Sequence, residues 1–402
     1  MTKKTSNTVE GEGSNAKRAR SISLDGILKI IRVGTAEEFK DLLTQGLISN
    51  INMTNERGET LLMVQCINHC LKGVKLLIEH GADVNITDGQ GNSAFILACR
   101  YYKDYAKEEC ASIIKFLVTK GANMNVISEF SSPIRGYQRG SALFEACIVS
   151  RLDVVSLLLE LGATVNDVDA LLVACVLRNI DVVKLFMSHG ADVNVSNNYG
   201  HTSLGIACHN GYNDLVDVLL DHGADMNLGS DVFNRTPFTL ACINSRLSTA
   251  KLLLDRGADV NRDMGATLVL SCEYAQICVV RLLLERGANV NGTLRNGRFS
   301  PLMAAVCRKD RGMIDLLLEY GADINAEDGG SCALSIAASF EQRENVILLL
   351  ERGADLYMAD GVTPIAHSTS GLLTADPEIA ALVEQYREVN KRANRAFKPL
   401  LK

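Results

Sequence analysis

Residues 279–291 read VVRLLLERGANVN, an apolar stretch that runs into a glycine followed by Ala-Asn-X-Asn. The arrangement recurs along the chain, often ending in GADVN or a close variant, and its glycines are Gly46, Gly81, Gly121, Gly162, Gly190, Gly223, Gly257, Gly287, Gly321 and Gly353. The steps between them are 35, 40, 41, 28, 33, 34, 30, 34 and 32 residues. A period of about 33 residues predicts a solenoid of stacked helix pairs, an architecture that usually serves binding.

A second motif follows most of these glycines after about ten residues. It reads GNSAFILAC at 91–99, GSALFEAC at 140–147, GHTSLGIAC at 200–208 and NRTPFTLAC at 234–242. Together the two motifs resemble the ankyrin repeat, whose pattern combines a T-P-L-H-x-A opening helix, a V-V-x-L-L-L second helix and a GADVN exit. The resemblance covers roughly residues 24–386. It implies an all-α ankyrin-repeat solenoid of about eleven helix-turn-helix units with finger loops, including an N-terminal and a C-terminal cap.

The side chains of one repeat explain why it forms helices that end in a turn. Val279, Val280 and the three leucines after Arg281 give a short helix a wide apolar face, which must be buried against neighbouring units. Gly287 ends the helix because glycine tolerates the positive φ of a left-handed cap. Polar residues then favour a turn, and Ser or Thr before the next apolar run caps the following helix.

Charge divides the chain into three parts. Residues 1–23 form a polar tail of net charge +3, which we expect to be disordered, and residues 387–402 form a basic tail of net charge +5, which could continue as a solvated helix. The whole chain carries −6, so the repeat domain, residues 24–386, carries −14. An acidic body disfavours nucleic acid and favours a partner protein with a basic segment, although a merely solvated acidic surface is equally compatible.

Neither cysteine nor histidine suggests a reactive centre. Seven of the twelve cysteines occupy one repeat position, where a thiol serves as a small buried apolar group: Cys66, Cys99, Cys147, Cys175, Cys208, Cys242 and Cys272. Paired CxxC motifs are missing, so we expect no metal site and no disulfide. His80, His189 and His222 precede helix-ending glycines and are predicted caps. We therefore expect no enzyme and no cofactor.

The chain departs from the family pattern at one position. The fourth residue of the opening motif is histidine in the family consensus, but here the residues are Met63, Ile96, Phe144, Leu172, Gly205, Thr239, Val269, Met303 and Ser335. In the family this histidine ties neighbouring repeats by hydrogen bonds. We therefore expect this chain to depend more on apolar contacts between repeats.

Two insertions in the third repeat indicate where a partner could bind. The finger loop 126–139 carries Phe130, Arg135, Tyr137 and Arg139, and the segment RYYKDYAKEE between the two helices carries Tyr101, Tyr102 and Tyr105. Aromatic residues and arginine are enriched in binding hot spots, although tyrosines could instead cover a locally exposed core. Other fingers contribute Tyr199, His201, Phe233, Arg235, Arg295 and Arg298.

We therefore predict a protein-binding scaffold or adaptor, monomeric, that binds its partner on the finger-loop and inner-helix face. One alternative is a nuclear or signalling regulator controlled by the basic segment at 17–20, beside which Ser21 and Ser23 are candidate phosphorylation sites. A substrate adaptor of a ubiquitin ligase and an enzyme are further alternatives. No apolar run predicts membrane insertion, so we expect a cytoplasmic protein that could also enter the nucleus. The resemblance also implies asparaginyl hydroxylation at Asn85, Asn194 and Asn261.

Overall fold

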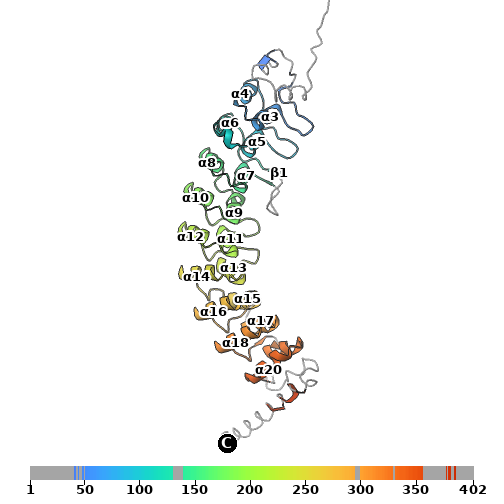
Figure 1. Cartoon of the computed structure of the whole chain (residues 1–402), viewed down its shortest axis with the longest axis vertical. Coiled ribbons are helices and arrows are strands. Elements are labelled where there is room, and N and C mark those ends of the chain that lie inside the picture. Colours follow the sequence, from blue (N-terminus) through green and yellow to red (C-terminus); the bar gives the residue numbers. More distant parts are fainter. Residues whose placement is uncertain are drawn as a thin grey trace, which may run out of the picture. The chain divides into compact units, whose positions relative to one another are not determined.

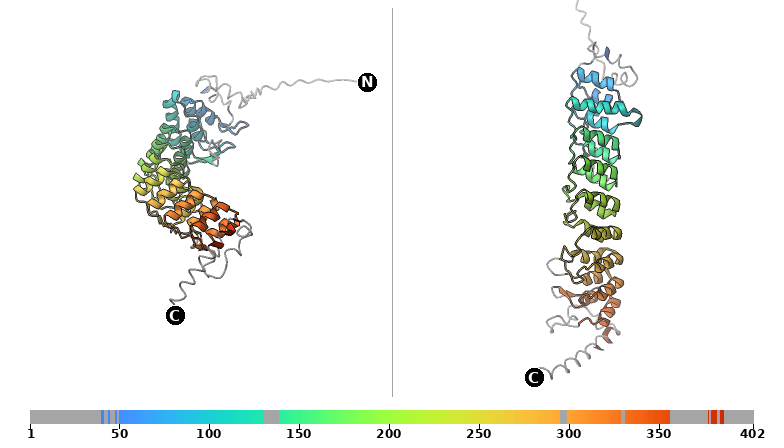
Figure 2. Two further views of the ribbon diagram at one scale, coloured as in Figure 1. Left: turned by 60° about the horizontal axis from the view of Figure 1, so that its bottom comes forward. Right: turned by 90° about the vertical axis from the view of Figure 1, so that its left-hand side faces the viewer.

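The structure, a computed structural model, describes residues 51–129, 139–294, 299–328 and 331–355, with scattered residues in 40–50 and 377–385. The chain divides into two compact units, Met1–Val173 and Ala174–Lys402. In each unit, helix pairs stack side by side (Figures 1 and 2). The predicted all-α fold of helix-turn-helix units is confirmed, and nine pairs, α3/α4 to α19/α20, lie within the described ranges. The two predicted tails lie outside the described residues.

Within residues 51–167, unit 1 contains three helix pairs. Its helices are α3 (Leu61–Ile67), α4 (Leu71–Glu79), α5 (Ala94–Arg100), η1 (Asp104–Ala106), α6 (Lys107–Thr119), α7 (Ala142–Ile148) and α8 (Leu152–Glu160). Strands β1 (Ser128–Glu129) and β2 (Arg139–Gly140) pair antiparallel in the finger before α7. The first helices α3, α5 and α7 pack in sequence, and α4 packs on α6. The boundary between the units falls within α9 (Val168–Val176).

Unit 2 continues the same alternation. Its elements are α10 (Ile180–Ser188), α11 (Ser203–Asn210), α12 (Asn213–Asp221), α13 (Pro237–Ile243), α14 (Leu247–Asp255), α15 (Ala266–Tyr274), α16 (Ile277–Glu285), α17 (Pro301–Arg308), α18 (Arg311–Glu319), β3 (Glu327–Asp328), β4 (Ser331–Cys332), α19 (Ala333–Ser339) and α20 (Arg343–Glu351). First helices pack on first helices from α11 to α19, and second helices on second helices from α10 to α18. Among the described helices, none has the length and apolar character needed to span a bilayer.

The helix ends follow the predicted chemistry. Hydroxyl oxygens accept the N–H three residues on at the start of six first helices, at Thr60, Ser93, Ser141, Thr202, Thr236 and Ser300. The second helices end at glycines of positive φ, such as Gly190 at 79°. The rings of His80, His189 and His222 lie 2.7–2.9 Å from a carbonyl oxygen four residues earlier, so their role as caps is confirmed.

Buried aliphatic side chains and cysteines form the core between helix pairs. Val279, Val280 and Leu283 are inaccessible to solvent, and the seven cysteines in register are at most 7% exposed. Burial raises the pKa of the Cys175 thiol to about 12, so it stays protonated at neutral pH. The described cysteines form no disulfide. The prediction that these cysteines are packing residues is confirmed.

The repeat position where the family consensus has histidine is occupied in two different ways. Ile96 and Phe144 fill it with fully buried apolar side chains, as expected. In unit 2, by contrast, Thr239 and Thr267 lie 2.7 Å apart through their hydroxyl oxygens, on the neighbouring first helices α13 and α15. Gly205 leaves room for Ser230, because a Cβ at Gly205 would lie 2.3 Å from the Cβ of Ser230. The expected dependence on apolar contact is therefore wrong for these repeats, since hydroxyl groups connect them.

A row of asparagines joins successive repeats at the exit turns. Asn194 Oδ1 accepts the N–H of Asp225 at 2.8 Å, and Asn194 Nδ2 donates to the carbonyl of Gly223 at 3.2 Å. Corresponding bonds to Oδ1 occur at Asn52, Asn85, Asn261, Asn291 and Asn325. Asn227 occupies the same repeat position, but its side chain makes no such bond to the described residues.

Replacement of Asn194 by alanine should therefore destabilise unit 2 by about 1–3 kcal/mol, because two backbone groups lose their partner. Asn227→Ala is the matched control and should change the free energy of unfolding by less than about 0.5 kcal/mol. Denaturant unfolding measures the difference, and amide exchange at Gly223 and Asp225 locates it. Equal costs for the two substitutions would show that the row of asparagines contributes no stability.

Candidate functional site

Two neighbouring fingers of unit 2 share one turn geometry. Asp231 Oδ1 accepts the N–H groups of Phe233 and Arg235 at 2.9 and 3.0 Å, and Asn197 Oδ1 bonds the equivalent amides in the preceding finger. The residue after the tip has positive φ, 77° at Gly200 and 57° at Asn234. Such Asx turns fix the backbone through short polar side chains. They place Tyr199 at the tip of one finger, and Val232 and Phe233 at the tip of the next.

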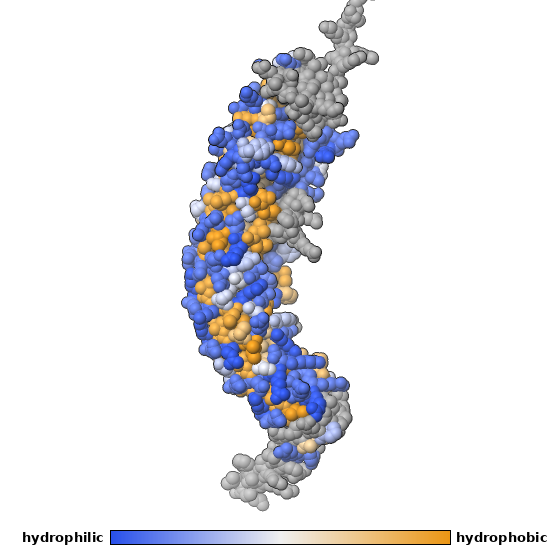
Figure 3. Space-filling model, viewed as in Figure 1, coloured by the Kyte–Doolittle hydropathy of each residue, from blue (hydrophilic) through white to orange (hydrophobic). Residues whose placement is uncertain are grey.

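Apolar side chains occupy the tips of three consecutive fingers in unit 2. Tyr199, Val232, Phe233 and Met264 are 66–83% exposed, and together we call them the finger ridge. Apolar surface projects at the right-hand edge of Figure 3 beside α11 and α13. Large apolar side chains exposed on adjacent elements mark interaction sites. Tyr199 and Phe233 were predicted from the sequence.

The sequence prediction missed Val232 and Met264. Val232 lies in a finger one residue longer than the preceding one, and Met264 lies in a shortened finger directly before Gly265. The turn that holds Met264 is closed by its N–H, which donates to the carbonyl of Asn261 at 3.0 Å. Met264 directly precedes Gly265, whose φ is 98°, as Tyr199 directly precedes Gly200, so aligning the two fingers on this glycine would have identified Met264.

Neighbouring groups hold the ridge in place. The Arg235 guanidinium lies 4.9 Å from the centroid of the Phe233 ring, and Arg235 Nε donates to Asp231 Oδ2 at 2.6 Å. The rings of Tyr199 and His201 lie 6.2 Å apart. A Cβ added at Gly200 would lie 3.0 Å from the carbonyl oxygen of Asp231. The first two tips of the ridge therefore belong to fingers whose backbones touch.

Several acidic side chains of unit 2 are bonded to close neighbours. The acidic side chains near the ridge are engaged locally, as Asp231 is with Arg235 and Asp263 is with the hydroxyl of Thr267 at 2.5 Å. Burial, and after it the guanidinium groups of Arg246 and Arg235, lower the pKa of His209 in α11. The exposed or half-exposed acids of α12, Asp214, Asp217 and Asp221, are likewise engaged, because they pair with Arg178 and Arg256.

The insertion between α5 and α6 is held by Arg151 at the start of α8. The Arg151 guanidinium lies 4.9 Å from the centroid of the Tyr102 ring, donates to the Tyr102 carbonyl at 3.0 Å and pairs with Asp104 at 2.9 Å. Tyr102 is only 4% exposed, and burial, above all, raises the pKa of its hydroxyl. Tyr102 thus covers the local core, the alternative given above, and we leave it out of the binding surface. Tyr105 is 83% exposed, and Tyr101 is also exposed.

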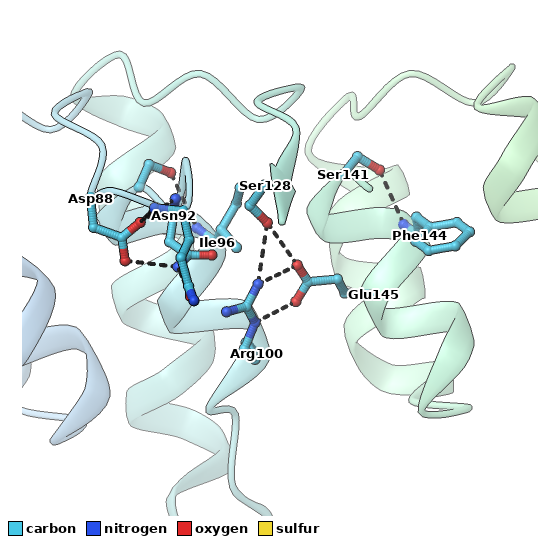
Figure 4. Close-up of polar contacts among 10 residues, drawn as sticks. Asp88, Asn92, Ile96, Arg100, Ser128, Ser141, Phe144 and Glu145 are labelled. Atoms are coloured by element: carbon cyan, nitrogen blue, oxygen red, sulfur yellow. Dashed lines mark hydrogen bonds and ion pairs between the residues drawn. The ribbon is translucent and has the colours of Figure 1, made fainter. Parts of the chain in front are cut away.

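The base of the long finger 126–139 is closed by a polar cluster that spans three elements (Figure 4). Arg100 in α5 donates to both carboxylate oxygens of Glu145 in α7 at 2.6 and 2.7 Å, and Ser128 in β1 donates to Glu145 at 2.9 Å. Burial lowers the pKa of Arg100, but the hydrogen bonds and charge of Glu145 outweigh it and raise this pKa overall. The pair fixes both strands of the finger relative to the first helices.

Several predicted partner-binding and modification residues lie outside the described part. These are Phe130, Arg135, Tyr137, Arg295, Arg298, Ser21 and Ser23, and for Arg139 the structure gives only its place in β2. The three asparagines predicted to be hydroxylated, Asn85, Asn194 and Asn261, all use both side-chain atoms in the inter-repeat bonds. Their hydroxylation stays a prediction.

One possible reactive pair appears away from the fingers. Cys110 Sγ lies 3.3 Å from His69 Nδ1. Burial is the main cause that raises the pKa of the Cys110 thiol and lowers that of His69, so both groups are neutral near pH 7. A reactive cysteine needs the opposite, a thiolate stabilised by a cation. Over the stretches that the structure describes, no three acidic, histidine or cysteine side chains are grouped to hold a metal ion.

Comparison with curated proteins finds short stretches of similarity. Ankyrin repeat protein L86 of Acanthamoeba polyphaga mimivirus is 28% identical over 125 residues, which is 28% of this chain and 21% of that protein. Protein L91 of the same virus is 37% identical over 81 residues, 18% of this chain and 13% of the relative. Phosphocholine transferase AnkX of Legionella pneumophila is 28% identical over 144 residues, 35% of this chain and 14% of the relative. The chain thus matches about a fifth or less of these proteins' lengths.

A solved structure and a family model of ankyrin repeats also match the chain. The ankyrin-repeat domain of Bcl-3, a member of the IκB protein family, is 27% identical with a TM-score of 0.46, over 53% of this chain and 97% of that domain. A family model of ankyrin repeats in three copies matches residues 29–128, 104–197, 143–230, 171–264, 228–293 and 268–360. These matches together cover most of the sequence. The chain belongs to the ankyrin-repeat family.

Proposed function

We propose that this chain is a scaffold or adaptor that binds a partner protein on its finger loops and first helices. Ankyrin repeats are generally protein-interaction modules. The observation that supports a finger-side site here is the finger ridge, where apolar tips are exposed on ordered turns. Ordered aromatic side chains bind at little entropic cost and are enriched in hot spots. A standard interface needs about 800 Å² from each partner, so several repeats must contribute.

Cross-linking of the full chain to partners captured from cells, followed by amide exchange of the purified complex, tests this proposal. Protection on the finger loops and first helices is expected, with second helices such as α12 and α14 unchanged. A parallel variant in which residues 126–139 are shortened to a tight turn shows whether the long finger takes part. Protection confined to the second helices would contradict a finger-side site.

The finer expectations stay predictions. We predict that the protein is monomeric and cytoplasmic, and that residues 17–20 could direct it to the nucleus. Phosphorylation at Ser21 and Ser23 and a role as a substrate adaptor of a ubiquitin ligase are also predictions. A partner with a basic segment, which the net charge of −14 over residues 24–386 favours, is another of these predictions. No contact among the described residues favours an enzyme over a binding protein, and the similarity to a phosphocholine transferase covers 14% of that protein.

A further inference from the structure

We propose that the finger ridge, Tyr199, Val232, Phe233 and Met264, binds an uncharged, proline-rich segment of a partner protein in the polyproline II conformation, with an apolar side chain at every third residue. This inference rests on the proposed function and adds the place and the chemistry of the partner. It follows from the order of the fingers, the distance between them, and the polar and charged groups beside their tips.

The three fingers of the ridge are tied together at their bases. The hydroxyl oxygens of Thr202 and Ser230 lie 2.7 Å apart and join the first finger to the second. Those of Thr239 and Thr267 are equally close and join the helices that follow the second and third fingers. The row of tips is therefore held by a fixed backbone, so a partner would not have to order it.

The distance between successive tips matches the pitch of a polyproline II helix. The first helices α11, α13 and α15, which follow the three fingers, pack on one another in sequence. Packed helices lie about 8–10 Å apart, and we expect the same distance between the fingers. Polyproline II rises about 3.1 Å per residue with three residues per turn, so residues i, i+3 and i+6 lie on one side about 9.3 Å apart. Three such residues can contact three successive tips.

A β-strand or an α-helix fits this row less well. Side chains on one face of a strand are two residues, or about 6.8 Å, apart, so they would fall out of step with the tips. An α-helix places residues on one face every seven positions, about 10.5 Å apart. Its side chains at i+3 and i+4 would then lie over exposed polar residues beside the tips, such as Asn198 and Asn234.

Hydrogen-bond donors beside the tips also favour polyproline II. Tyr199 and Arg262 are exposed, and neither the hydroxyl nor the guanidinium has a hydrogen-bond partner among the described residues. The carbonyl groups of polyproline II have no internal partner and can accept from these donors, whereas an α-helix bonds its carbonyls internally. Proline-rich segments bind aromatic-lined sites in other proteins because their conformation is already formed.

The segment is expected to be uncharged where it crosses the ridge. The three fingers, residues 195–202, 228–236 and 261–266, contain two arginines and two aspartates, so their charges cancel when histidine is neutral. Arg235 is moreover paired with Asp231 at 2.6 Å. A charged side chain buried against these tips would find no opposite net charge, which makes its desolvation costly.

The chain's own basic tail is a poorer occupant. Residues 387–402 carry a net charge of +5 and contain a single proline, Pro399, so they cannot supply an uncharged proline-rich segment. A second copy of this chain is the other alternative, and its contact through the ridge would appear as self-association.

Selection from a displayed library of random short peptides on the full chain tests the proposal. Uncharged peptides that contain prolines and have apolar residues three positions apart should be enriched. Phe233→Ser should weaken the binding of an enriched peptide at least about thirty-fold, as expected for a hot spot. Phe340→Ser, at an exposed phenylalanine at the end of α19, is the matched control and should leave binding unchanged. Because both rings are exposed, thermal unfolding of both variants should match the parent chain.

Three further changes establish the bound conformation. One residue inserted between two apolar positions of the peptide breaks their spacing and should weaken binding about ten-fold. Replacing the prolines of the peptide by alanine should also weaken binding about ten-fold, because the bound conformation is no longer formed in advance. Tyr199→Phe removes only a hydroxyl and should weaken binding about five-fold.

Five results would overturn the inference: enrichment of no peptide, enrichment of charged or proline-free peptides, tighter binding after the prolines are replaced, binding unaffected by Phe233→Ser, or self-association of the full chain that Phe233→Ser abolishes. The last would assign the ridge to a second copy. Partners that protect other fingers while ignoring Phe233→Ser would remove the ridge but keep the proposed function. Protection of second helices alone would remove both.

Discussion

Replacing Phe144 by alanine is expected to destabilise unit 1 by about 3–5 kcal/mol. The ring is fully buried in the first turn of α7, at the position where the family consensus has histidine. A Cβ at Gly140 would lie 2.2 Å from the ring, so strand β2 closes directly over it. Truncation would leave a cavity between the helix and the base of the long finger.

Denaturant unfolding followed by circular dichroism measures this loss, with amide exchange to locate it. Because each repeat contacts only its neighbours, faster exchange should concentrate around α5 to α8 and spare α13 to α18. Phe340→Ala, in which an exposed ring is lost, should change stability by less than about 0.5 kcal/mol. A small effect of Phe144→Ala would mean that the surrounding side chains collapse into the space.

Glu145→Ala should cost about 2–4 kcal/mol, because it leaves a guanidinium unpaired in a poorly solvated place. The side chains of Arg100 and Glu145 are 24% and 9% exposed. The loss includes both bonds from Arg100 and the bond from Ser128. We expect a smaller loss of stability than for a fully buried ion pair, since Arg100 retains some contact with water.

The double variant Arg100→Met with Glu145→Leu separates the charge from the packing. It should recover most of the stability, because replacing both partners by apolar groups removes the unpaired charge. Amide exchange at β1 and β2 is the second measurement, and Glu145→Ala should increase it. If the double variant were as unstable as Glu145→Ala, the pair would be needed for its geometry rather than to neutralise a charge.

The repeat architecture could be predicted because its signals are local. Glycines such as Gly190 end helices, and Thr202 or Ser141 starts them, within a few residues of the apolar face that they delimit. Similar local reasoning placed the cysteines in the core. Nothing in these signals depends on knowing which repeat lies next to which.

The polar links between repeats could not be predicted, because they join residues far apart in the sequence. Arg100 and Glu145 are 45 residues apart, and Thr239 and Thr267 are 28 apart. In the candidate site, the tips Tyr199 and Phe233 were found from residue type alone. Whether a tyrosine is exposed was not predictable: Tyr102 and Tyr105 differ because only Tyr102 lies under the Arg151 guanidinium.

The buried cysteines in register can report how often each repeat opens. A thiol whose pKa is raised by burial reacts with an alkylating reagent only when its repeat opens. Such thiols occur in successive repeats, at Cys66 and Cys99 in unit 1 and at Cys175, Cys208, Cys242 and Cys272 in unit 2. Alkylation rates followed by mass spectrometry would therefore give the opening frequency of each repeat without any engineered label. Comparing the rates with and without a bound partner would show which repeats the partner holds closed.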